Sequence, residues 1–170
     1  MELNSAFLSL GSNLGDRFLA LQSAVNELQA YGTIASCSRI YESAPWGFES
    51  DQNFYNLCVH FKTSLSPLEL LKTCKEIERK IGRTKNGKER YESRLIDIDI
   101  VLFGEQIYYS QTLVIPHPLY HQRNFVLIPL NEIATVLRDP LCGVVINQLI
   151  QNLPITENIK PINQKIFINN

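Results

Sequence analysis

Two aspartates, Asp97 and Asp99, interrupt a nearly continuous apolar stretch at residues 94–103. In a β-strand, side chains two residues apart share a face, and their Cα atoms lie about 6.6–6.8 Å apart. Two neighbouring carboxylates in an apolar strand repel each other and lose hydration unless a positive group lies between them. Oxygen ligands of this kind suit Mg²⁺. The alternative interpretation is an exposed strand face on which each aspartate pairs with a Lys or Arg across the sheet.

The segment before these aspartates is strongly basic. Residues 72–94 hold nine of the 16 Lys and Arg residues and four acids, so the segment carries +5 while the rest of the chain carries −6. Guanidinium groups such as those of Arg83, Arg90 and Arg94 match phosphate oxygens, and Lys85 adds positive charge. Acids for a metal beside bases for phosphates are the arrangement that phosphoryl transfer requires. A solvated helix end and loop is the alternative.

Two further polar residues occupy unusual positions. Glu78 falls on the apolar side of a predicted helix, where it either borders a ligand pocket or pairs with Lys75 or a residue across the sheet. His117 lies between two prolines, which fix the local backbone and present the ring in a defined place. A phosphate contact and a structural hydrogen bond are both compatible with this histidine.

An aromatic slot is a further prediction. Phe54, Phe125 and Trp46 offer flat apolar surfaces, and Asn56 offers a donor and an acceptor that can read the edge of a planar heterocycle. Scattered aromatic residues are also typical of an ordinary core, so both interpretations remain open.

The elements that position these residues follow from the apolar spacing. Strands are predicted at 5–10, 33–43, 54–63 and 94–103, and helices at 17–31 and from the Ser66–Glu69 capping box to Gly82. A hairpin at 105–116 and helices at 124–137 and 143–152 follow. The order β-α-β-β-α-β predicts an α+β, ferredoxin-like sandwich: an antiparallel sheet with both helices on one face, extended by a C-terminal hairpin and helices.

Length and composition bound the class of protein. The 170 residues, 45% hydrophobic and 19% charged, predict one globular domain at 1–153 and a polar C-terminal extension at 154–170 that is compatible with loose attachment. No apolar run approaches the roughly 18–20 residues of a membrane helix, and no signal peptide is recognisable, so we expect a cytoplasmic protein. The net charge of −1 argues against a nucleic-acid partner. The four cysteines lack metal-binding spacing and are predicted to be reduced core residues.

Together these segments resemble the 6-hydroxymethyl-7,8-dihydropterin pyrophosphokinase family of folate biosynthesis. The resemblance covers residues 5 to about 135, and the Arg94-x-x-Asp97-x-Asp99 pattern is its most specific part. The other matching segments are Leu10–Arg17, Tyr41–Gly47 with Asn56, Pro116–Pro118 and Arg123–Leu127.

The resemblance implies transfer of pyrophosphate from ATP to the pterin hydroxymethyl group with release of AMP, by a monomer. It implies that Asp97 and Asp99 hold two Mg²⁺ ions. The implied ATP contacts are Glu78, Arg94, Ile100, His117 and Arg123. The implied pterin contacts are Ser43, Ala44, Trp46, Asn56, and Phe54 and Phe125 on the two faces of the ring. The implied catalytic residues are Arg83, Lys85, Arg90 and Arg94.

Two other function classes fit the same topology. A two-metal nucleotidyltransferase or cyclase also sets paired acids on such a sheet, but it releases pyrophosphate where a pyrophosphokinase releases AMP. A small ligand-binding regulatory module would need neither the aspartate pair nor the arginine cluster.

Overall fold

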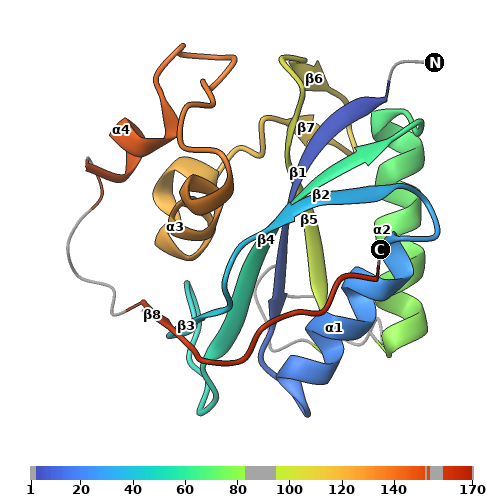
Figure 1. The fold of residues 1–170 in the computed structure, drawn as a ribbon. Coiled ribbons are helices and arrows are strands. Elements are labelled where there is room, and N and C mark those ends of the chain that lie inside the picture. Colours follow the sequence, from blue (N-terminus) through green and yellow to red (C-terminus); the bar gives the residue numbers. More distant parts are fainter. Residues whose placement is uncertain (1–2, 83–94, 152, 154–158, 170) are drawn as a thin grey trace.

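The computed structural model describes residues 3–82, 95–151, 153 and 159–169. A twisted antiparallel sheet lies between α1 and α2 on one side and α3 on the other (Figure 1). The strands are β1 (Asn4–Ser12), β2 (Thr33–Cys37), β3 (Tyr41–Ser43), β4 (Phe54–Thr63), β5 (Asp97–Phe103), β6 (Tyr108–Tyr109), β7 (Val114–Ile115) and β8 (Lys160–Pro161). The helices are α1 (Arg17–Leu28), α2 (Pro67–Ile81), the 3₁₀ turn η1 (Tyr120–Gln122), α3 (Asn124–Ile133) and α4 (Ile146–Gln151).

The strand order is β5-β1-β4-β3-β8, and β2 also pairs with β4. The predicted mixture of helices and antiparallel strands is therefore confirmed. The strand predicted at 33–43 divides into β2 and β3, which pair with different halves of β4. A register shift between Ile34 and Ser36 bends the chain there.

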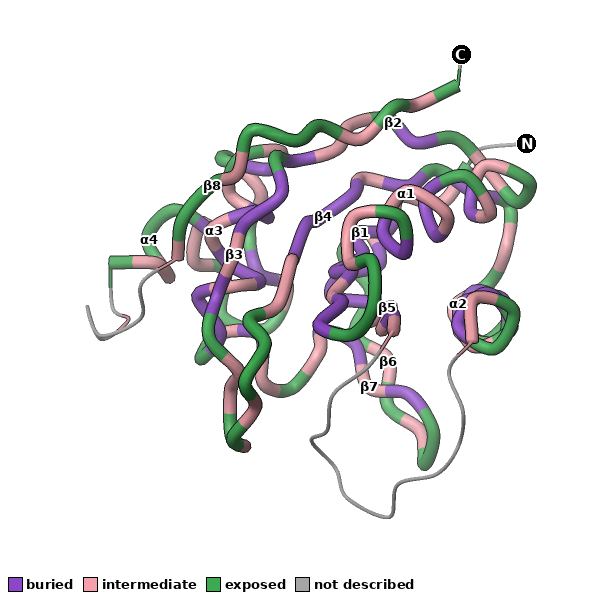
Figure 2. The backbone as a smooth tube through the Cα atoms, turned by 90° about the horizontal axis from the view of Figure 1, so that it is seen from below, coloured by how far each residue is buried: buried purple, intermediate pink, exposed green. Residues whose placement is uncertain are grey.

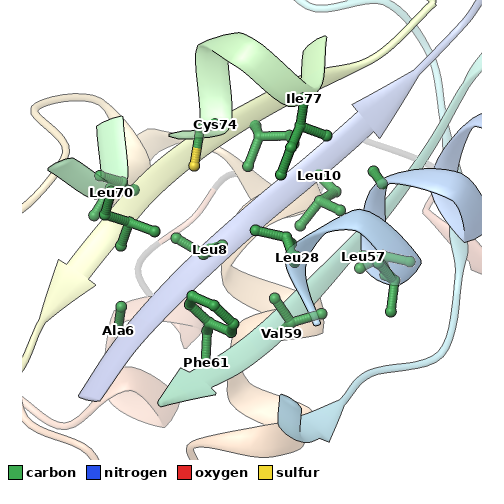
Figure 3. Packing of buried hydrophobic residues seen from close by; sticks show 14 of the residues in the cluster. Ala6, Leu8, Leu10, Leu28, Leu57, Val59, Phe61, Leu70, Cys74 and Ile77 are labelled. Carbon is green, nitrogen blue, oxygen red and sulfur yellow. The ribbon is translucent and has the colours of Figure 1, made fainter. Parts of the chain in front are cut away.

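One face of the sheet is closed by α1 and α2. Leu8 and Leu10 of β1 both point to this side, and they pack against Leu28, Cys74 and other residues of the two helices (Figure 3). Both leucines are fully buried, and each such burial stabilises the fold by about 1.5–3 kcal/mol. The amide of Ser66 donates to the Glu69 carboxylate at 2.8 Å, so the predicted helix start forms at α2.

The opposite face is covered only in part. Phe7 and Leu102 pack here against Leu127 and Leu130 of α3. Regular alternation along β5 would put Leu102 on the same face as Ile98, but Leu102 lies on the opposite face. The pairing of β1 with β5 shifts between Phe7 and Leu8, so Leu8 faces Ile100 and Phe7 faces Leu102. This irregularity reverses the alternation and turns Leu102 to the α3 side.

The predicted C-terminal elements are present with shorter bounds. The hairpin forms as β6 and β7, and the two helices form as α3 and α4. Residues 159–169 run along the edge of β3 and over α1, and most of them are exposed (Figures 1 and 2). The side-chain amide of Gln22 donates to the Phe167 carbonyl at 2.7 Å and accepts from the Phe167 amide at 2.9 Å.

Three of the four cysteines lie at least partly inside the molecule, as predicted, and Cys142 is exposed. Burial raises the pKa of the Cys74 thiol to about 12, so this thiol is protonated at neutral pH. Cys142 was predicted in the core because its neighbours are apolar, but it lies in the turn that the Gly143 amide closes on the Asp139 carbonyl. In the part of the chain that the structure describes, no helix is both long and apolar enough to cross a membrane.

Candidate active site

The uncovered end of the α3 face carries the polar residues of three neighbouring strands. Asp97 and Asp99 alternate with the buried Ile98, so they share a face, as their spacing predicts. In register with them on β1 are Gly11 and Ser9, and Gly11 is in turn opposite Asn56 of β4. The β1 residues directly opposite the two aspartates are therefore uncharged.

These residues line one cavity of about 220 Å³. Its walls come from β1, β3, β4, β5, the loop at 44–53, the segment at 117–119 and the start of α3. The lining residues are Ser9, Gly11, Ser43, Ala44, Trp46, Phe48, Phe54, Asn56, Asp97, Asp99, His117, Pro118, Leu119, Arg123, Phe125 and Val126. The structure therefore brings all six predicted pterin contacts and both predicted metal ligands to one cavity.

The aspartate pair gives the cavity its negative charge. Burial, and then the nearby charge of Asp97, raise the pKa of Asp99 to about 7. His117 Nε2 and the Arg123 guanidinium each lie 3.9 Å from Asp99 Oδ2, longer than a hydrogen bond. Two neighbouring carboxylates on one strand face offer the oxygen ligands that a hard divalent cation such as Mg²⁺ prefers.

His117 and Arg123 reach Asp99 from the segment that joins β7 to α3. The backbone amide of His117 donates to the Val101 carbonyl at 2.9 Å, which ties this segment to β5. His117 Nδ1 accepts from the Leu119 amide at 3.2 Å, so the neutral ring carries its proton on Nε2. The histidine thus makes a structural hydrogen bond with one nitrogen and turns the other towards Asp99.

The aromatic residues form two pairs around the cavity. Trp46 and Phe125 lie with ring centroids 6.4 Å apart, and Phe48 and Phe54 meet edge to face at 6.0 Å. The Arg123 guanidinium lies 4.9 Å from the centre of the Trp46 ring, a cation–π distance that links the aromatic and charged groups. Flat apolar walls of this kind suit a planar ligand.

The hydrogen-bonding group between these walls is the Asn56 amide. This buried amide donates to Ser43 Oγ at 2.9 Å, which fixes its orientation. Gly11 leaves space for the amide oxygen, because a Cβ at this position would lie 3.1 Å from Asn56 Oδ1. A glycine inside an apolar strand indicates such a close approach. That signal identifies Gly11, which the sequence analysis did not assign to the site.

The loop at 44–53 is held by the turn after β1 and by the first residue of α1. Arg17 Nη1 donates to the Asn53 carbonyl at 2.8 Å and pairs with Glu42 at 3.1 Å, while its guanidinium lies 3.7 Å from the centre of the Tyr55 ring. The Asn13 amide reaches Ser50 Oγ at 3.4 Å. These two segments therefore hold the loop that carries Ala44 and Trp46.

Several cavity residues were missed by sequence reasoning. Phe48, Leu119 and Val126 carry no pattern that separates them from core residues, and Ser9 is a single small polar residue in an apolar strand. Only their position at the open end of the α3 face makes them part of the site.

Two predicted ATP contacts lie outside the cavity lining. The Glu78 carboxylate is buried under β5, where it accepts from the Ile98 amide at 2.9 Å and pairs with Lys75 at 2.9 Å. Of the two interpretations offered for Glu78, the structure shows the pairing. Ile100 is 3% exposed and belongs to the core beneath α1 and α2.

The predicted catalytic residues Arg83, Lys85, Arg90 and Arg94 lie outside the described residues. In the described part of the basic segment, Lys80 pairs with Glu27 at 2.6 Å and Arg79 lies 3.9 Å from Glu76. Both ion pairs lie on the surface of α2. For this helix they agree with the alternative interpretation of the basic segment as a solvated helix end.

Comparison with known proteins places the chain in one family. The model of the 7,8-dihydro-6-hydroxymethylpterin-pyrophosphokinase (HPPK) family matches residues 7–135. The 2-amino-4-hydroxy-6-hydroxymethyldihydropteridine pyrophosphokinase of Bacillus subtilis is 42% identical over 133 residues, which are 77% of this chain and 78% of that protein. The enzyme of the same name from Aquifex aeolicus is 40% identical over 139 residues, 81% of this chain and 84% of its own.

Solved structures show the same fold. A Plasmodium falciparum HPPK-DHPS chain matches 88% of this chain with a TM-score of 0.72 and 19% identity. An HPPK-DHPS solved in complex with substrates matches 89% with a TM-score of 0.69 and 16% identity. The present chain spans less than half of these longer chains, 45% and 43% respectively.

Proposed function

The chain belongs to the 7,8-dihydro-6-hydroxymethylpterin-pyrophosphokinase family, and from this membership we propose that it transfers pyrophosphate from ATP to 6-hydroxymethyl-7,8-dihydropterin in folate biosynthesis. The products are AMP and the pterin diphosphate. One observation carries the proposal: a single cavity joins an aromatic and amide lining to a pair of aspartates with a histidine and an arginine beside them. The strand order also leads us to class the fold as ferredoxin-like, with the C-terminal elements added.

The aromatic part of the cavity is the proposed pterin site. Phe54 and Phe125 come from different elements, β4 and α3, and offer their rings to the two faces of the pterin. Asn56 keeps its oxygen and one amide hydrogen for the pterin edge after bonding Ser43. Ser43, Ala44 and Trp46 supply backbone and side-chain contacts from β3 and the following loop.

The charged part of the cavity is the proposed site of the ATP phosphates. Asp97 and Asp99 are the residues that would hold two Mg²⁺ ions, because their oxygens face the cavity and burial makes Asp99 prefer a bound positive charge. Magnesium held by these residues would supply positive charge that neutralises the ATP phosphates. His117 and Arg123 donate to phosphate oxygens from the opposite wall, and Arg94 is the further proposed nucleotide contact, whereas Glu78 and Ile100 lie outside this cavity.

In the transfer, the hydroxymethyl oxygen bonds to the β-phosphorus of ATP, and the bond from that phosphorus to the α-phosphate oxygen breaks. The hydroxyl proton passes to solvent water, and AMP departs with the electron pair of the broken P–O bond. The chain contributes orientation, since both substrates are held in one cavity, and positive charge from Arg123 and from the proposed catalytic residues Arg83, Lys85, Arg90 and Arg94.

Product analysis tests the proposal. The protein is incubated with Mg-ATP and 6-hydroxymethyl-7,8-dihydropterin, and the products are separated by anion exchange. AMP and pterin diphosphate in equal amounts are expected. Pyrophosphate release would instead support a nucleotidyltransferase, and ligand binding without turnover would support a regulatory module. The variant Asp99→Asn is the matched control for contaminating activity.

A further inference from the structure

A buried carboxylate lies outside the cavity, behind the segment that carries His117 and Arg123. Asp139 is 0% exposed and lies beyond residues 7–135, the part of the chain that the family model matches. Its Oδ1 accepts from the amides of Leu141 at 2.6 Å and Cys142 at 2.8 Å. Its Oδ2 accepts from His121 Nε2 at 2.7 Å and from the hydroxyl of the buried Tyr120.

These bonds keep the carboxylate ionised. Burial alone would raise the pKa of Asp139, but the hydrogen bonds from Tyr120, Cys142, His121 and Leu141 outweigh it and lower the pKa to about 2. A buried anion of this kind is costly to leave without its partners, so it holds the groups that donate to it.

Two of those donors belong to η1, the turn between the cavity residues His117 and Arg123. The Tyr120 amide donates to the His117 carbonyl at 3.2 Å, and the Arg123 amide donates to the Tyr120 carbonyl at 3.2 Å. The outer side of this turn therefore contacts Asp139, and the residues at its two ends face Asp99.

We propose that Asp139 is a positioning residue of the nucleotide site: it fixes η1 so that His117 and Arg123 are held beside Asp99. This inference rests on the proposed function, because it takes His117 and Arg123 as ATP contacts. The pterin contacts Asn56 and Ser43 lie on β4 and β3, away from this bond network, whereas Phe125 and Trp46 contact Arg123. We therefore expect Asp139 to affect the nucleotide more strongly than the pterin.

A metal site is the competing interpretation of the same residues. Ligand atoms of His121, Asp139 and Cys142 lie within 4.8 Å of one another. Both Asp139 oxygens already accept two hydrogen bonds each, which occupies the lone pairs that a metal would need. The geometry therefore favours positioning.

The test compares three variants in the intact chain. Asp139→Asn replaces one carboxylate oxygen with a donor, and Tyr120→Phe removes one hydroxyl. Arg138→Ala is the matched control, because Arg138 bonds the Gly143 carbonyl at 2.9 Å in the same loop and is not bonded to η1. Melting temperature, steady-state kinetics for ATP and the dissociation constant for the pterin are measured for each.

Asp139→Asn should raise the KM for ATP about tenfold, the loss expected for one hydrogen bond to a charged group. Tyr120→Phe should raise it less, and Arg138→Ala should leave it unchanged. The pterin dissociation constant should change less than the KM for ATP in Asp139→Asn and Tyr120→Phe, and should stay at the wild-type value in Arg138→Ala. A merely structural role would instead lower the active fraction of Asp139→Asn at unchanged KM, or weaken both substrates to the same extent, and either result would overturn the proposal.

Two further outcomes separate this inference from the proposed function. If the wild-type chain turns over ATP and pterin while Asp139→Asn keeps its KM for ATP, only the positioning role fails. If the wild-type chain forms no AMP, the proposed function itself fails. Zn²⁺ binding to the wild-type protein that Cys142→Ser abolishes would show that the cluster is a metal site and would also overturn the positioning role.

Discussion

The two faces of the sheet are built from the same strands but meet different requirements. Along β1, Leu8 and Leu10 face α1 and α2 and are fully buried, while Ser9 and Gly11 face the other way and line the cavity. The helices α1 and α2 lie over the first face and α3 over the second (Figure 1). Phe7 packs against α3, whereas the cavity lies at Ser9 and Gly11, further along the same strand. The cavity lies where side chains of β1 still alternate between the two faces but α3 no longer covers the second face.

The two faces also differ in what they contribute to stability. The face beneath α1 and α2 buries hydrocarbon, which favours folding. The cavity face places Asp97 beside the partly exposed Asp99, and the pKa of Asp99 is raised because the folded protein disfavours its charge. Residues kept at a cost to the fold mark the region as functional.

The largest expected effect separates activity from stability on the cavity face. Asp97→Asn and Asp99→Asn should each lower kcat/KM by about 10³-fold or more, because each removes a charge that a metal requires. Each should also unfold at the same or a higher temperature than the wild type, since like-charge repulsion is relieved. Kinetics with Mg-ATP and thermal unfolding of the same samples measure both. Pterin binding without ATP serves as the control for an intact cavity, and activity within tenfold of wild type would contradict the metal assignment.

In the core beneath α1 and α2, a substitution is expected to lower stability and leave substrate binding unchanged. Leu10→Ala, one residue before Gly11, should lower the free energy of unfolding by about 2–5 kcal/mol because it leaves a cavity in a closed core. The protein that remains folded should keep the wild-type KM for both substrates. Urea unfolding and kinetics at a temperature well below the midpoint measure the two quantities. If the change in KM, converted to a free energy, exceeded the loss in the free energy of unfolding, the two faces would not act separately.

A smaller and more specific effect is expected at Gly11. In Gly11→Ala the added Cβ would lie 3.1 Å from Asn56 Oδ1 and 3.7 Å from Phe54, so the amide must shift away from its bond with Ser43. The pterin dissociation constant should rise about tenfold, the equivalent of one hydrogen bond. The melting temperature should change little. Calorimetric titration measures the affinity, and Ser9→Ala, at the next position on the same face, is the comparison variant. Unchanged affinity would remove Gly11 from the site.

Much of this contrast could be predicted from sequence because it depends on local alternation. The spacing of Asp97 and Asp99 within an apolar strand is enough to place both on one face, and the structure agrees. The same rule fails at Leu102, because the register shift opposite Phe7 depends on the neighbouring strand and has no signal within β5 itself. Periodicity is reliable only as long as the pairing is regular.

Contacts between distant segments were beyond any local pattern. The charged group at Glu78 was recognised as unusual, but only the fold shows that it accepts from the Ile98 amide of the adjacent strand. His117 and Arg123 come within 3.9 Å of Asp99 because η1 folds the chain back between β7 and α3. The family resemblance supplied these positions together, where residue types and spacing left each of them open.

The smallest expected effect is on the pH dependence of stability, because different interactions hold the two faces. The helical face is held by apolar contacts, whereas the turn beside the cavity is held by the Asp139 carboxylate. The pKa of Asp139 is about 2 in the folded protein and about 3.9 in an unfolded chain, so its ionisation stabilises the fold above pH 4 and that contribution is lost as the pH falls towards 2. The difference in unfolding free energy between wild type and Asp139→Asn should therefore shrink between pH 5 and pH 2, while the difference between wild type and Leu10→Ala stays constant. Urea unfolding across this range measures both, and parallel curves for the two variants would show that charge does not hold this wall of the cavity.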